Sequence, residues 1–231
     1  VIVIGHSTGC QDAVFYMKHG KPELRARVSG VVLQAPVSDR EWRESLPDTE
    51  EFVRYARVST GAAELMPSVA EPDAPITVSR YLSLSAKARD DDMFSSDLSA
   101  KERQSRLGHM ASVPTLAVLS AADEYVPRGS GGVLPEGGVP GQEFVSSSIP
   151  GGQREEGRDS RSPEVLAENL RRVLMPGSES RTCGVEGSTN MFSGGGSCSK
   201  VYVIDGANHA LGDEMHAREF VAEVTMFVAQ L

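Results

Sequence analysis

Three side chains that lie far apart in the sequence are of the types that together activate a serine for nucleophilic attack. Ser7 lies in "GHSTG" near the start of the chain, Asp123 lies in "SAADEYVP", and His209 lies in "GANHALG". A serine hydroxyl becomes a strong nucleophile when an imidazole takes its proton and a carboxylate orients that imidazole. These residue types, in this order, predict catalysis through a covalent acyl-enzyme.

The residues around Ser7 predict a tight turn between a strand and a helix. Residues 1–4 are apolar without alternation, which is typical of a parallel strand buried on both faces, and residues 8–17 have a helical pattern. We expect that Gly5 and Gly9 flank the turn because a Cβ at either position would collide with the other element. Ser7 is then left at the tip of the turn, in front of a helix N-terminus. A chance turn rich in Gly and Ser is the alternative interpretation.

The predicted acid and base each follow a later strand. After a strand over residues 115–119, Asp123 or Glu124 could supply the carboxylate. We favour Asp123, because it lies where the loop leaves the strand and an apolar "YVP" follows. Turn capping is an alternative role for Asp123, and a structural role is one for His209. The backbone N–H of Thr8 is the predicted donor to the oxyanion of the reaction, and the sequence identifies no second donor.

The other histidines and the cysteines favour structural roles. His209 and His216 are not at the i, i+4 spacing that places two imidazoles on one face of a helix, so we expect neither a metal site nor a cofactor. Cys10, Cys183 and Cys198 include no C-x-x-C pair, and Cys10 is expected to pack in the core. Few cysteines in an odd number are typical of a reducing compartment, so we expect a cytoplasmic location.

The elements that must position these residues alternate along the chain. Buried strands are expected at about 1–4, 31–35, 115–119 and 200–205, and helices at 8–17, 163–174 and 212–231. Alternation of buried strands with helices predicts an α/β fold with a parallel sheet flanked by helices.

The domain organisation follows from changes in composition. Residues 1–231 are read as one partial domain, and 40–109 are read as a helical cap insertion that prolines divide into short helices. Segments 128–161 and 176–199 are rich in Gly, Ser and Pro and are expected to be disordered loops. Three aromatic residues of the insertion are candidates either for the walls of a pocket or for core packing: Trp42, Phe52 and Tyr81.

Composition limits the classes of partner. The 231 residues include 23 basic and 32 acidic side chains, for a net charge of −9. A net negative surface repels phosphate backbones, so nucleic acid is not an expected partner. No stretch approaches the roughly 18 apolar residues of a membrane span. A small-molecule ester is the expected partner, and the sequence does not predict an oligomeric state.

Four segments of the chain resemble one family. "GHSTGCQD", "LQAPVSDRE", "DEYVP" and "ANH" are similar to the family of α/β-hydrolases of largely unassigned function that includes fungal siderophore esterases. The resemblance implies an α/β-hydrolase fold, ester hydrolysis, Ser7 as nucleophile, Asp123 as acid and His209 as base. In that fold several strands precede the nucleophile, so we expect the chain to lack an N-terminal portion.

Two alternatives to an esterase stay open at this point. The same triad would serve acyl transfer or peptide hydrolysis, because fold does not determine the acceptor. A truncated protein without catalytic function is the other alternative, since loss of the early strands would leave a sheet edge unpaired.

Overall fold

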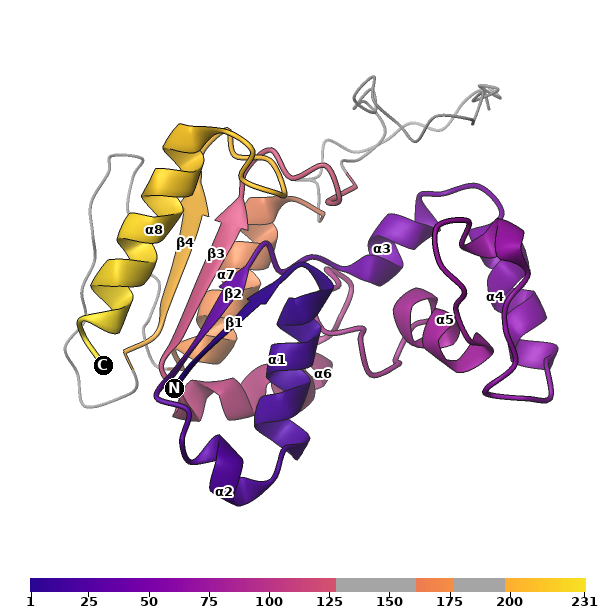
Figure 1. Ribbon diagram of the computed structural model, residues 1–231, viewed down its shortest axis with the longest axis horizontal. Coiled ribbons are helices and arrows are strands. Elements are labelled where there is room, and N and C mark those ends of the chain that lie inside the picture. The colour runs from indigo at the N-terminus through magenta and orange to yellow at the C-terminus, as the bar shows by residue number, and fades with distance from the viewer. Residues whose placement is uncertain (128–160, 177–197) are drawn as a thin grey trace.

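The computed structural model describes residues 1–127, 161–176 and 198–231, which form a parallel sheet with helices on both faces (Figure 1). The strands lie in the order of the chain and each neighbouring pair is parallel: β1 (Ile2–His6), β2 (Gly30–Gln34), β3 (Thr115–Ser120) and β4 (Lys200–Ile204). The main helices are α1 (Thr8–His19), α6 (Ala100–Leu107), α7 (Pro163–Leu174) and α8 (Glu214–Val228), with a short α2 (Pro22–Arg25) after α1. The predicted α/β fold class is confirmed.

The two faces of the sheet bury different side chains because successive strand residues point to opposite faces. Val31 and Leu33 of β2 pack with α1, α6 and α7, whereas Val32 packs with α8. β3 follows the same rule, with Ala117 on the first face and Leu116 on the second. Because all four strands are parallel, their carboxyl ends meet at one edge, and this edge carries the candidate site.

The ends of two helices follow the predicted signals. The Ser162 hydroxyl accepts a hydrogen bond from the Val165 N–H at 3.3 Å, and Pro163 occupies the first turn of α7. At the C-terminus of α1, the Gly20 N–H donates to the Tyr16 carbonyl at 2.8 Å. These groups would otherwise be left without partners at the helix ends.

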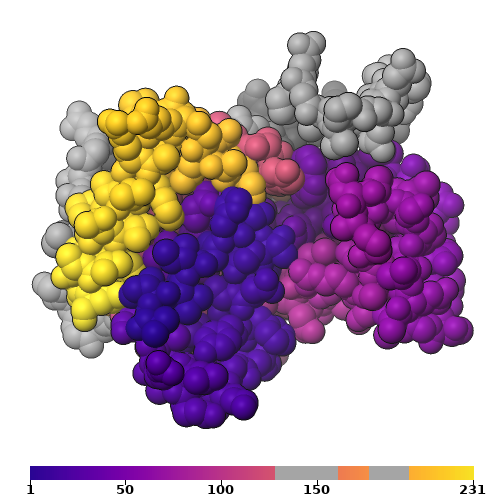
Figure 2. Space-filling view, in the orientation of Figure 1, coloured from indigo at the N-terminus to yellow at the C-terminus, as the bar shows by residue number. Residues whose placement is uncertain are grey.

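The segment between β2 and β3 projects beside the sheet (Figures 1 and 2). It contains α3 (Asp39–Glu44), α4 (Thr49–Val58) and α5 (Val78–Ser85), with a short 3-10 turn, η1 (Ser68–Ala70). The helices α4 and α5 enclose a small core of their own: Val53, Ala56, Met66, Val78 and Tyr81. Helix α6 and the 3-10 turn η2 (Gly108–Ser112), at the end of the predicted insertion, pack instead with α7 and α1. The predicted 40–109 insertion thus has a projecting part and a part that covers the sheet.

Two further predictions concern disordered loops and membrane-spanning helices. The segments 128–161 and 176–199, expected to be disordered, lie almost wholly outside the described residues. None of the helices that the structure describes is both long and apolar enough to cross a bilayer.

Candidate functional site

Ser7 lies in a strained turn that joins β1 directly to α1. Its backbone has φ 55° and ψ −128°, a conformation that a residue with a Cβ adopts at a cost. The Ser7 N–H donates to the carbonyl of Gln34 at 3.1 Å, which fixes the turn against the end of β2. A Cβ on Gly5 would lie 2.3 Å from the Gly9 carbonyl oxygen, so this glycine is required for the close approach of strand and helix. The same expectation for Gly9 is wrong, because no described atom lies within 4 Å of a Cβ built there.

Asp123 and His209 are brought together at the edge where β3 and β4 end. Nδ1 of His209 lies 2.9 and 3.0 Å from the two carboxylate oxygens of Asp123, and both side chains are buried. A carboxylate only accepts hydrogen bonds, so Nδ1 is the donor in this contact, and in the neutral imidazole Nε2 then carries the lone pair. The Tyr125 N–H donates to the Asp123 carboxylate at 2.9 Å and holds it in the turn. The structure thus places a serine turn after β1, an aspartate after β3 and a histidine after β4 at one edge of the sheet.

Glu124, the alternative acid, does not contact the His209 ring. Its carboxylate accepts the backbone N–H of His209 at 2.9 Å instead. On the other side of the same residue, the Gln34 side chain donates to the His209 carbonyl at 3.1 Å. Asp123 therefore holds the ring, while Glu124 and Gln34 hold the backbone.

Two aromatic rings, those of His6 and Tyr125, lie against the His209 ring, and a third, that of Trp42, lies behind Tyr125. The centroid of the His6 ring lies 5.0 Å from that of the His209 ring, and the centroid of the Tyr125 ring lies 4.5 Å from it. The Trp42 ring, from α3, packs on Tyr125 at 4.9 Å. Of the three candidate wall residues, Trp42 thus lies near the site, whereas Tyr81 is buried in the core of the insertion. For His6, its position before Ser7 is the only signal that the sequence carried.

Ser7 and His209 are not hydrogen-bonded to each other in the part of the chain that the structure describes. The backbone N–H of Thr8, at the first position of α1, likewise donates to no acceptor among the described residues. It is therefore available at a helix N-terminus, where backbone donors and the helix dipole favour negative charge. Catalytic hydrogen bonds in proteins without substrate are often long and shorten in the complex.

Asp39 is a half-buried carboxylate beside the turn at Ser7. It accepts hydrogen bonds from the Thr8 hydroxyl at 3.3 Å and from the Gln11 side chain at 2.5 Å. Burial raises the pKa of Asp39 above its ordinary value, although the nearby Arg43 charge and the Thr8 hydrogen bond oppose this effect. The sequence signal was available, because Asp39 follows a strand whose carboxyl end lies at the same edge as Ser7.

Cys10 has the core position that the sequence predicts. Its side chain is fully buried behind the turn, and its thiol donates to the carbonyls of Gly5 and Gln34. Burial raises the pKa of the Cys10 thiol, which disfavours the reactive thiolate. Cys198 is free and exposed, and Cys183 lies outside the described residues.

Comparisons with known proteins show what the chain is similar to. The chain is 28% identical over 174 residues to the fusarinine C esterase sidJ of Aspergillus fumigatus, an alignment that covers 55% of the chain and 49% of that protein. It is 27% identical over 144 residues to the UPF0613 protein PB24D3.06c of Schizosaccharomyces pombe, covering 54% of the chain and 45% of that protein. The chain thus spans about half the length of these relatives.

Among solved structures, Rv0554 from Mycobacterium tuberculosis superimposes with a TM-score of 0.43 at 16% identity, covering 100% of this chain and 66% of that one. Residues 1–131, more than half of the chain, match the family described as "Protein of unknown function (DUF1749)". This match includes the turn at Ser7 and the loop that carries Asp123. The chain belongs to that family.

Proposed function

We propose that the protein is a serine hydrolase that cleaves carboxylic esters through Ser7, His209 and Asp123. The observation that carries the proposal is the buried contact of the His209 Nδ1 with the Asp123 carboxylate, at the same sheet edge as the strained Ser7. This contact leaves the Nε2 lone pair of His209 as the base for the hydroxyl of Ser7.

The reaction proceeds in two balanced halves. His209 Nε2 takes the Ser7 hydroxyl proton as Oγ attacks the ester carbonyl carbon, and the resulting oxyanion accepts a hydrogen bond from the Thr8 N–H. The intermediate then expels the alcohol, which leaves with the proton from His209. Water repeats the sequence on the acyl-enzyme and releases the carboxylic acid. Asp123 stabilises the imidazolium that forms in each half.

The substrate class is proposed from the family relatives. Similarity to a protein named fusarinine C esterase supports siderophore-type esters as the first substrates to assay. Acyl transfer and peptide hydrolysis would use the same three residues, so the assay includes an alcohol acceptor and a peptide. The expected cytoplasmic location is supported by cysteine usage alone and stays a prediction.

The test compares Ser7→Ala with Ser105→Ala in hydrolysis of a short-chain nitrophenyl ester and of fusarinine C. Ser105 is an exposed residue of α6, so its hydroxyl serves as the matched control. We expect Ser7→Ala to lower kcat/KM by about 10⁴-fold or more, as loss of a triad member does elsewhere. Turnover by Ser7→Ala at the rate of the control would refute the proposal.

A further inference from the structure

His209, the residue that carries the predicted base, is held by the loop after β3 and by the end of β2. The ring of His209 is held by Asp123, its backbone N–H by Glu124 at 2.9 Å, and its carbonyl by Gln34 at 3.1 Å. The His6 ring nitrogen also approaches the His209 carbonyl at 3.4 Å. The acid loop after β3 therefore contacts both the side chain and the main chain of one residue after β4.

Asp123 and Glu124 are consecutive residues of one loop, and their two carboxylates contact different parts of His209. The contact to Asp123 fixes Nδ1 but leaves the backbone of His209 without a partner from this loop. The contact to Glu124 fixes the backbone from which the ring projects, and the rings of Tyr125 and His6 limit its tilt. The backbone position and the tilt of the ring together determine the direction in which Nε2 points.

We propose that Glu124 is a positioning residue that orients the His209 base through the His209 backbone N–H. This inference rests on the proposed function, since it assigns a role within the same site. A hydrogen bond to a charged acceptor is stronger than one between neutral groups. Glu124 also stabilises the fold, because the partly buried N–H of His209 would have no hydrogen-bond acceptor among the described residues without it.

The structure distinguishes this role from general stabilisation. Glu124→Ala removes the acceptor, whereas Glu124→Gln keeps an oxygen at the same position. Misplacement of a reacting group by about 1 Å can cost on the order of 100-fold in rate. We therefore expect Glu124→Ala to lower kcat by about 10- to 100-fold with little change in KM, and Glu124→Gln to recover most of the loss.

The experiment measures these kinetics together with the ¹H NMR resonance of the His209 Nδ1 proton in the protein without substrate. Asp123→Asn identifies that resonance by its loss. Glu124→Ala should shift or broaden it, and Glu124→Gln should restore it. Glu214→Ala, which removes an exposed carboxylate on α8, is the matched control and should change neither readout.

Two results would overturn the inference. One is a Glu124→Ala variant with wild-type kcat and an unchanged Nδ1 resonance. The other is an equal loss of kcat in Glu124→Gln and Glu124→Ala, in proportion to a fall in Tm, which would indicate packing alone. If the wild-type protein shows no ester hydrolysis, the proposed function fails, but the resonance still tests whether Glu124 orients the ring.

Discussion

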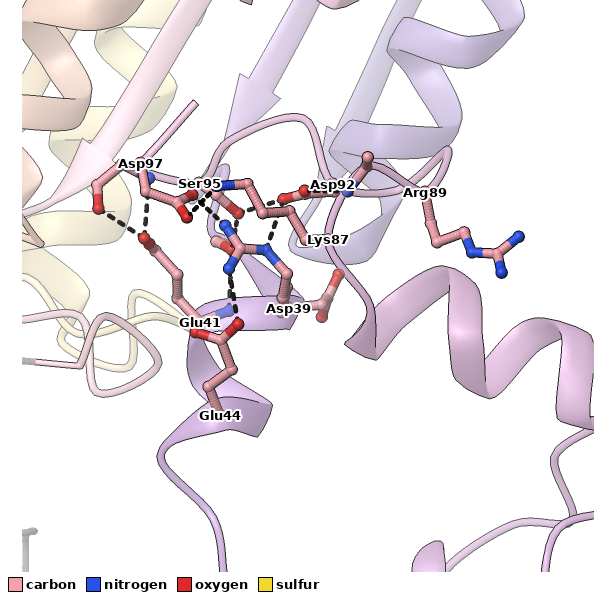
Figure 3. A network of polar contacts seen from close by, with 12 residues as sticks. Asp39, Glu41, Glu44, Lys87, Arg89, Asp92, Ser95 and Asp97 are labelled. Atoms are coloured by element: carbon pink, nitrogen blue, oxygen red, sulfur yellow. Dashed lines mark hydrogen bonds and ion pairs between the residues drawn. The ribbon is translucent and has the colours of Figure 1, made fainter. Parts of the chain in front are cut away.

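Arg40 joins the two ends of the projecting insertion, and its loss should be among the most destabilising single changes in the protein. The side chain lies on α3, is 4% exposed, and donates to Asp92 at 3.0 Å, to Glu44 at 2.6 Å and to Asp97. The Asp92 side chain is fully buried and also accepts from the Ala88 N–H at 2.9 Å. Figure 3 shows Glu44, Asp92 and Asp97 brought together from the two ends of the insertion.

The magnitude follows from the burial of Asp92. Arg40→Ala leaves that carboxylate in the interior with only neutral donors, and removal of one partner from a buried ion pair costs about 3–5 kcal/mol. A protein of this size has a free energy of unfolding of about 5–15 kcal/mol, and each kcal/mol corresponds to about 2–4 °C in Tm. We therefore expect a fall in Tm of about 6–20 °C.

The assay is urea unfolding combined with hydrogen exchange followed by mass spectrometry. Because α4 and α5 have their own core, exchange should rise first in peptides from residues 45–85. Arg54→Ala removes an exposed arginine whose nearest ion-pair contact, to Glu50, is 3.8 Å, and should cost about 0.5 kcal/mol or less. Arg40→Met combined with Asp92→Leu should recover most of the loss, because no charge is then left buried.

A loss below about 1 kcal/mol for Arg40→Ala would refute this reasoning, since the buried-pair penalty sets a lower bound near 3 kcal/mol. An even rise in exchange over the sheet and the insertion would contradict the assignment of Arg40 to the junction between them.

Three further changes test the site and its support. Gly5→Ala should lower the free energy of unfolding by about 3 kcal/mol, because the new Cβ would lie 2.3 Å from a backbone atom. Gly9→Ala should be tolerated, because a Cβ there meets no such atom among the described residues. Equal urea midpoints for the two variants would contradict this prediction. Burial raises the pKa of Asp39, so the folded state binds its proton more tightly than the unfolded state. The stability of wild type relative to Asp39→Asn should thus be greatest near pH 4 and fall as the pH rises to 7; urea titrations in which it rises instead would exclude this cause. Trp42→Ala removes the ring that packs on Tyr125 beside the base, and should lower kcat/KM by about 2- to 10-fold in the ester assay, while an unchanged value would place Trp42 outside the site.

The order of strands and helices could be predicted because burial on two faces requires continuous apolar runs. The run of apolar residues in β2 has this character, and the Ser162 and Pro163 signals marked the start of α7. Helix α4 shows what a sequence pattern leaves open. Phe52, Tyr55, Ala56 and Val58 recur at helical spacing, which predicts one apolar face, yet the side chains of Tyr55 and Val58 are 39% and 75% exposed. The element against which a helix packs determines which of its faces is buried. Helix α4 packs on α5 rather than on the sheet.

The pairing of Asp123 with His209 could be expected because parallel strands end at one edge. The roles of Glu124 and Gln34 could not, because each depends on a side chain meeting the backbone of a residue 85 or 175 positions away. The sequence pattern also did not predict that Arg40 is buried against Glu44, Asp92 and Asp97. A charged residue among charged neighbours reads as a solvated surface until its burial is known.

Covalent labelling of the protein tests whether His209 activates Ser7. The protein is incubated with a fluorophosphonate, and the modified peptide is identified by mass spectrometry. We predict one adduct on Ser7, its absence in Ser7→Ala, and labelling slowed by about 100-fold or more in His209→Ala. An adduct confined to another residue, or labelling of Ser7 at an undiminished rate without the imidazole, would contradict the prediction.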